Sequence, residues 1–155
     1  KTQKREFGDI GEKIAEDLKA ALKGRDQARV SVLRMLLSAL HNKEIETRAA
    51  LTDEQVLSVL VYEQKKHRDS IEQFKTGGRP DLAGKEEAEL GVIESYLPEV
   101  MGEDELQVIV REVIAKIGAK GKEDFGKVMK EVMVKVRGRA DGSAVSEIVS
   151  EKLPK

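Results

Sequence analysis

The chain has 155 residues, of which 28 are Lys or Arg and 29 are Asp or Glu, and its net charge of −1 excludes a protein that is basic throughout. It has no cysteine, which excludes disulfide bonds, cysteine-ligated zinc and thiol catalysis. No apolar run approaches the about 18 residues of a membrane helix and no signal-peptide pattern is present, so we expect a cytoplasmic protein without a membrane partner.

Apolar residues recur at helical spacing along most of the chain, and only 3% of the residues are aromatic. This pattern predicts an all-α fold of amphipathic helices. We expect two parts, a four-helix N-terminal region over residues 1–97 and a small three-helix C-terminal domain over residues 98–155. The boundary is placed at Leu97-Pro98, because proline closes the preceding helical segment.

The first predicted helix begins at Asp9, where Glu12 stands three residues later as the partner of a capping box. Its apolar stripe includes Phe7, and Gly24 ends it. Asp26 is then expected to cap the second helix, since its carboxylate can accept from the backbone of the first turn.

The third predicted helix has the clearest local start, because Thr52 and Gln55 form a capping box. Its helical spacing continues to Thr76, after which Gly77-Gly78 end it. A fourth helix is expected to begin at Pro80. The first residue of a helix has no acceptor for its backbone N–H within the helix, so proline loses no hydrogen bond there.

The C-terminal region is predicted to form helices over residues 103–117 and 124–136, followed by a last helix that begins after Asp141 or Ser143. Gly118 marks the turn after the first of them. Three short helices fold alone only marginally, so we expect this region to dock on the first.

No catalytic residues, metal site or other cofactor are expected. The two histidines, His41 and His67, have Glu44 and Glu63 on the same expected helix faces, and one carboxylate with one imidazole gives too few ligands for a tight metal site. His67 is instead expected to fill a seam between helices. A further acidic group that could bind a cation is expected to form a solvated helix face: Glu86, Glu87 and Glu89.

The stretch from Lys116 to Arg139 holds eight basic and three acidic residues, a net charge of +5. Several of the basic residues fall near expected helix ends, where backbone amides can also meet phosphates. We predict a small basic face for a polyanion, against the alternative of a salt-bridged surface. With few aromatic residues, RNA would be bound through its backbone and folded shape. The candidate RNA-binding residues are Lys120, Lys122, Lys127, Lys130, Arg137 and Arg139.

A second basic group lies on the second and third predicted helices, which are expected to be antiparallel neighbours. The two sets of side chains would then either converge or pair with nearby carboxylates, and their spacing leaves both outcomes open. The residues of this group are Arg29, Arg34, Lys65 and Arg68.

The stretch Phe125-Gly126-Lys127-Val128-Met129-Lys130, followed by Gly138-Arg139-Ala140-Asp141-Gly142, resembles the tail domain of GatB, a subunit of tRNA-dependent amidotransferases. Further segments resemble the YqeY family, which places such a tail behind a helical region. They are Arg29-Val30-Ser31-Val32-Leu33-Arg34-Met35-Leu36, Arg68-Asp69-Ser70-Ile71-Glu72-Gln73-Phe74, Glu86-Glu87-Ala88-Glu89-Leu90 and Tyr96-Leu97-Pro98. The resemblance covers nearly the whole chain, with one departure: GatB tails are often shorter where Lys135-Val136-Arg137 precedes the glycine turn.

The resemblance implies an accessory tRNA-binding module without catalysis of its own, because the catalytic cradle of GatB has no counterpart here. A YqeY-like region is also appended to some glutaminyl-tRNA synthetases. The resemblance therefore implies tRNA as a partner, with amidotransferase or aminoacyl-tRNA synthetase subunits as further candidate partners. The alternatives are a helical protein–protein adaptor and a component of a glutamine-dependent carbon–nitrogen ligase, which would complete another subunit's site.

The glycines of the GatB-like stretch have expected structural roles. Gly126 would permit close approach at the start of its helix, and Gly138 and Gly142 would permit positive φ in the turn that follows. Arg139 would project from this turn, and Asp141 would cap the last helix rather than act in catalysis.

Overall fold

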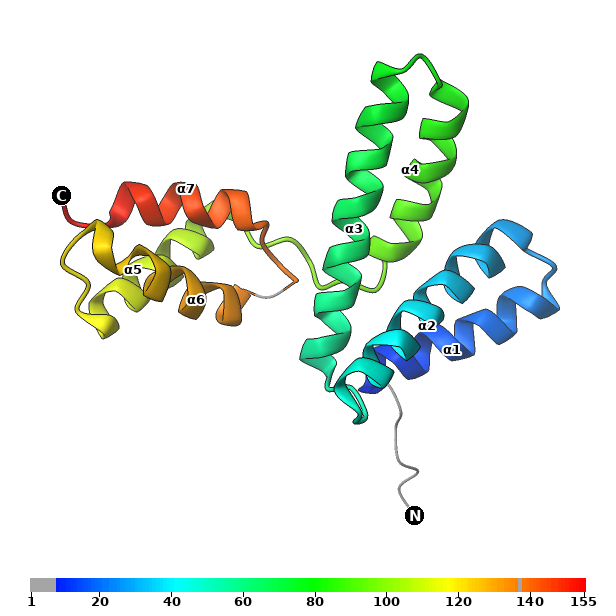
Figure 1. Ribbon diagram of the computed structural model, residues 1–155, viewed down its shortest axis with the longest axis horizontal. Helices are drawn as coiled ribbons and strands as arrows, with labels where there is room; N and C mark the ends of the chain where they lie inside the picture. The colour runs from blue at the N-terminus through cyan, green and yellow to red at the C-terminus, as the bar shows by residue number, and fades with distance from the viewer. Residues whose placement is uncertain (1–7, 137) are drawn as a thin grey trace. The chain divides into compact units, whose positions relative to one another are not determined.

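The computed structural model describes residues 8–136 and 138–155 (Figure 1). These residues form seven α-helices and one short 3₁₀ helix, with no strand among them, which confirms the predicted all-α fold. The chain divides into two compact units, residues 1–97 (the N-terminal unit) and residues 98–155 (the C-terminal unit). None of the helices in the described part of the chain is both long and apolar enough to cross a membrane.

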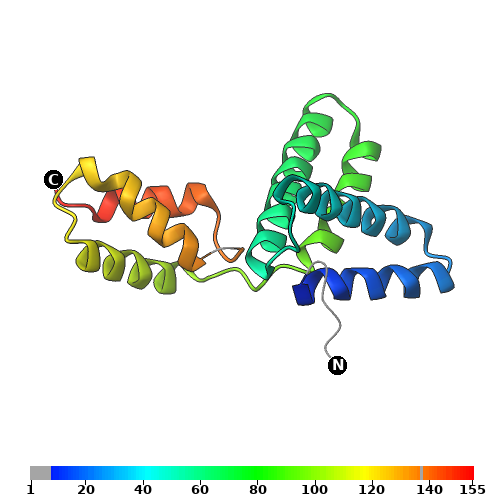
Figure 2. The ribbon, with the colours of Figure 1, turned by 60° about the horizontal axis from the view of Figure 1, so that its bottom comes forward.

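The N-terminal unit consists of two helical hairpins that pack on each other. Helices α1 (Gly8–Lys23) and α2 (Gln27–Thr47) form the first, and α3 (Asp53–Thr76) and α4 (Pro80–Glu94) form the second, as Figures 1 and 2 show. The main packing partner of α3 is therefore α4, whereas its contact with α2, the expected partner, is smaller.

Local capping explains where two of these helices begin. The Asp26 carboxylate accepts from the backbone N–H of Arg29 at 3.1 Å, and Thr52 and Gln55 close both bonds of the predicted capping box. Asp9 does not cap α1: it lies inside the first turn, and its own N–H donates to the Asp53 carboxylate at 3.0 Å.

Phe7, expected at the start of the first apolar stripe, lies outside the described residues. The core of this unit is built from aliphatic side chains of all four helices, and Tyr96 closes it after α4. The Tyr96 hydroxyl donates to Asp17 on α1, and burial together with this hydrogen bond raises the pKa of Tyr96. The largest fully buried members of this core are Ile14, Leu33, Leu36, Leu40, Leu60 and Ile93.

The C-terminal unit contains α5 (Glu103–Ile117), the 3₁₀ turn η1 (Lys122–Asp124), α6 (Phe125–Val136) and α7 (Gly142–Lys152). Gly118 ends α5 in the left-handed conformation, at φ 72°, as its position predicts. One inward stripe from each helix forms the core, and most of its members are β-branched. The stripes are Leu106, Val110 and Val113 from α5, Val128, Val132 and Val136 from α6, and Val145, Ile148 and Val149 from α7.

Candidate nucleic-acid interface

Helix α6 presents two of the predicted basic residues to solvent. Val128, Val132 and Val136 are fully buried on one side of the helix. Lys127 and Lys130 are exposed and lie three residues apart on the opposite side. No ion pair joins either lysine to another residue in the described part of the chain. Their ammonium groups are therefore available to an anion in solution.

Lys120 and Lys122 lie in the turn that leads from α5 into η1, and both are exposed. The backbone N–H of Lys120 donates to the Asp124 carboxylate at 2.9 Å. The expectation that backbone amides here also meet phosphates is therefore wrong for Lys120, because Asp124 already uses that donor. The side chains of Lys120 and Lys122 form no ion pair with any residue that the structure describes.

The sequence pattern predicts that Arg139 projects from the turn before α7, but in the structure its side chain lies against the start of the C-terminal unit. Its Nε donates to the Glu99 carbonyl at 3.2 Å, and its two Nη atoms lie 3.3 and 3.4 Å from the Glu105 carboxylate. The Arg139 carbonyl in turn accepts from the N–H of Met101 at 2.6 Å. These bonds join the turn to the segment before α5 and to the first turn of α5. Arg139 is thus a structural residue of the C-terminal unit.

Asp141 is the N-cap of α7, as expected, and its carboxylate accepts from the N–H of Ser143 at 3.3 Å. The carboxylate thus occupies the helix end that an anion would otherwise approach. Arg137, the remaining candidate in this stretch, lies outside the described residues.

The three glycines of the GatB-like stretch differ in their roles. Gly138 has a φ of 78°, as predicted for the turn. Gly142 is the first residue of α7 and its φ is not positive, so that prediction is wrong. Gly126 is exposed, and a Cβ added there would meet no atom within 4 Å. The close approach expected at Gly126 is therefore not present within the described chain.

The second basic group does not form one free set of cations. Nη2 of Arg68 lies 3.0 Å from the Glu94 carboxylate, which also accepts from Gln64 at 2.8 Å. Arg34 and Lys65 are exposed on α2 and α3. Because Arg68 is already paired, at most part of this group can meet an outside anion.

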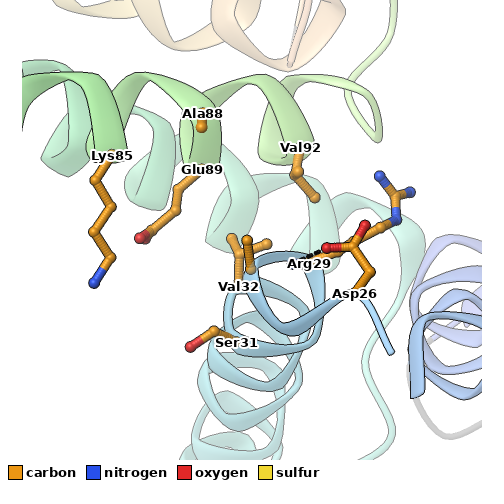
Figure 3. Close-up of a pocket in the computed structure, with 9 residues that line it drawn as sticks. Asp26, Arg29, Ser31, Val32, Lys85, Ala88, Glu89 and Val92 are labelled. Atoms are coloured by element: carbon orange, nitrogen blue, oxygen red, sulfur yellow. Dashed lines mark hydrogen bonds between the residues drawn. The ribbon is translucent and has the colours of Figure 1, made fainter. Parts of the chain in front are cut away.

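Arg29 lies at a cavity of about 210 Å³ between the start of α2 and one face of α4. Figure 3 shows the side chains from the two helices facing each other across it. Positive and negative groups both contribute, so the cavity has no single sign of charge. The residues that line it are Asp26, the N-cap of α2, then Ala28, Arg29, Ser31 and Val32 from α2, and Lys85, Ala88, Glu89 and Val92 from α4.

The sequence pattern did not reveal a polar cluster between α3 and α4. His67 is buried in the seam between these helices, as expected, but Glu86 and Glu89 face it and are mostly covered, so the expected solvated face is wrong for both. Burial lowers the pKa of His67, but the Glu63 carbonyl and the two carboxylates outweigh burial and raise it above its ordinary value. The spacing of Glu86 and Glu89 would have revealed the cluster only if the α3–α4 pairing were known.

Comparisons with known proteins bear on the identity of this chain. The family model described as Yqey-like protein matches residues 11–153. A relative from Pyrenophora tritici-repentis, named Altered inheritance of mitochondria protein 41, mitochondrial, is 30% identical over 91% of this chain and 77% of its own length. Relatives of the same name from Vanderwaltozyma polyspora and Saccharomyces cerevisiae (strain YJM789) are 39% and 34% identical, over 54% and 59% of this chain.

The matches cover 46% and 50% of those last two relatives, so the chain spans about half their length. The family model, in contrast, extends over both units and over every helix from within α1 to the end of α7. The resemblance to the YqeY family seen in the sequence is confirmed by this match, and the chain belongs to the family of YqeY-like proteins.

Proposed function

We propose that this chain is an accessory RNA-binding module that holds the backbone of a folded RNA, with tRNA as the first candidate. The observation that carries the proposal is a run of exposed lysines that leads from the α5–α6 turn onto α6 and forms no ion pair with any described residue. They are Lys120, Lys122, Lys127 and Lys130 (the lysine run). The resemblance of the same stretch to the GatB tail supports tRNA as the ligand.

The chemistry of the lysine run suits phosphates better than bases. Ammonium groups on flexible stems act as point charges, and each neutralised phosphate releases counterions whatever the base sequence. Side chains three residues apart on a helix, as Lys127 and Lys130 are, have Cβ atoms about 5–6 Å apart and can reach neighbouring phosphates. We therefore expect binding that depends on RNA shape and salt but little on sequence.

Replacing two members of the run tests the proposal. Lys127→Gln with Lys130→Gln should weaken binding of labelled tRNA by about tenfold at low salt, or about 0.7 kcal/mol for each lysine, because two phosphate contacts are lost. Fluorescence anisotropy measures the change. The matched control is Lys19→Gln with Lys23→Gln, which removes the same charge from two exposed positions of α1 that form no ion pair within the described residues. Equal weakening by both double variants would reject a localised site.

A protein adaptor is the second candidate, and one observation favours it. Val134, with 53% of its surface exposed, lies four residues after Lys130 on the outward side of α6. This face thus carries an apolar as well as a basic element. A stable complex with an amidotransferase or synthetase subunit that survives nuclease treatment, and that Val134→Ser disrupts, would support this function over RNA binding.

The ligase alternative has no observation in its favour and stays a prediction. The cytoplasmic location also stays a prediction, and the names of the three relatives make mitochondria a second compartment to examine. Fractionation of cells that express the full-length protein would distinguish the two.

A further inference from the structure

A nitrogen and two carboxylate oxygens converge in the seam between α3 and α4. Nε2 of His67 lies 3.1 Å from Oε1 of Glu89 and 3.5 Å from Oε2 of Glu86, and the three atoms all lie within 4.8 Å of one another. His67 is 6% exposed, and the glutamate side chains are 24% and 21% exposed. The three groups therefore meet at a half-buried point with access to solvent.

The other ring nitrogen decides what Nε2 can offer. Nδ1 of His67 lies 2.9 Å from the backbone carbonyl oxygen of Glu63. A carbonyl oxygen can only accept, so Nδ1 must carry the hydrogen. In the neutral ring, Nε2 then presents a lone pair to two carboxylates that are also acceptors. Three electron-pair donors that face one another repel unless a proton or a metal cation lies between them.

Charge balance points the same way. In the described part of the chain, no lysine or arginine lies within ion-pair distance of Glu86 or Glu89, whereas Lys75 pairs with the neighbouring Glu87 at 3.0 Å. With a neutral imidazole the cluster carries two negative charges. A proton on the ring would cancel one of them, and a divalent cation would cancel both.

We propose that His67, Glu86 and Glu89 bind a divalent transition-metal ion such as Zn²⁺. One imidazole and two carboxylates are a donor set that Zn²⁺ accepts, whereas Mg²⁺ and Ca²⁺ prefer oxygen ligands alone. Metal–ligand bonds of about 2.0–2.1 Å in a tetrahedron place ligand atoms about 3.3–3.4 Å apart. The two separations from Nε2 in the structure, 3.1 and 3.5 Å, lie on either side of this value.

The surroundings support such a site. The Nδ1–H bond to a backbone carbonyl fixes the ring with Nε2 toward the ion, as the outer hydrogen bonds of metal-binding histidines do. Glu89 also lines the cavity between α2 and α4, so one of the three proposed ligands borders a space that solvent can enter (Figure 3). The ion would join the two helices of the second hairpin, with a water in the fourth position.

Metal titration of the EDTA-treated full-length chain tests the proposal. Calorimetry with Zn²⁺ should give saturable binding of one ion per chain, and Co²⁺ should give the intense visible absorption of a tetrahedral site. His67→Gln should abolish both signals. The matched control is His41→Gln, because His41 is exposed and is the only other histidine. Glu89→Gln should also abolish binding, and its control Glu87→Gln should retain it.

A measurement on the unaltered protein keeps the test decisive if His67→Gln unfolds. Zn²⁺ should shift the Nε2 resonance of one of the two histidines in ¹⁵N spectra, and that signal should persist in His41→Gln. The proposal is overturned if the unaltered chain shows no saturable Zn²⁺ binding, if a folded His67→Gln binds equally well, or if the shifted resonance belongs to His41. In those cases a proton alone holds the cluster together.

Discussion

Arg139 and the lysine run show how differently two kinds of cation behave in one basic stretch. The partners of Arg139 lie 34 and 40 residues before it in the sequence, so local spacing could not reveal them. Its planar guanidinium donates from Nε to a carbonyl and from both Nη atoms to one carboxylate, a fixed two-bond geometry that a lysine ammonium cannot reproduce. The eight basic residues between Lys116 and Arg139 therefore include one side chain that stabilises the fold, Arg139, and four that are available to a ligand, those of the lysine run.

Arg139→Gln should destabilise the protein by about 1–2 kcal/mol, because a partly exposed ion pair and a hydrogen bond to the Glu99 carbonyl are both lost. Urea unfolding followed by circular dichroism measures the change. Arg111→Gln on the exposed side of α5 is the control and should have little effect. If Arg139→Gln leaves stability unchanged but abolishes tRNA binding, the residue belongs to the RNA interface after all.

At the scale of elements, the glycines of α6 and of the turn after it make a matched pair. Gly126 lies in α6 with open space around its Cα, so Gly126→Ala should stabilise the protein by about 0.5 kcal/mol through a smaller entropy loss on folding. Gly138 has positive φ, so Gly138→Ala should destabilise it by about 1–2 kcal/mol. Thermal and urea unfolding of the two variants provide the comparison.

The same pair separates structure from function. Gly126 faces open space, as the lysines on the outward side of α6 do, so a bound RNA could approach it closely. If Gly126→Ala is stable but weakens tRNA binding, a ligand rather than the fold requires the glycine. A destabilised Gly126→Ala would instead contradict the open surroundings described above.

Helix positions were predictable because their signals are local. The caps at Asp26, Thr52 and Asp141 depend on bonds to residues two or three positions later. Helix pairing was not predictable in this way, since α3 packs mainly on α4 and less on α2, the helix that precedes it. The polar cluster around His67 depends on the α3–α4 pairing. Patterns within one helix therefore predicted that the carboxylates of Glu86 and Glu89 are exposed to solvent.

At the scale of the whole molecule, net charge conceals where cations are available. The C-terminal unit has eleven basic and eleven acidic residues, so it carries no net charge of its own. Long-range attraction of a polyanion by this unit is therefore weak, and binding must depend on the lysine run at short range. This predicts modest affinity. That each compact unit also folds as an independent domain stays a prediction.

The salt dependence of tRNA binding tests the central claim most directly. If the four lysines of the run each neutralise one phosphate, the logarithm of the binding constant should fall against the logarithm of salt concentration with a slope of about −3 to −4. In the Lys127→Gln, Lys130→Gln variant the slope should decrease to about −1 to −2. A slope near zero for the unaltered chain, or the same slope in both proteins, would contradict RNA binding through these lysines.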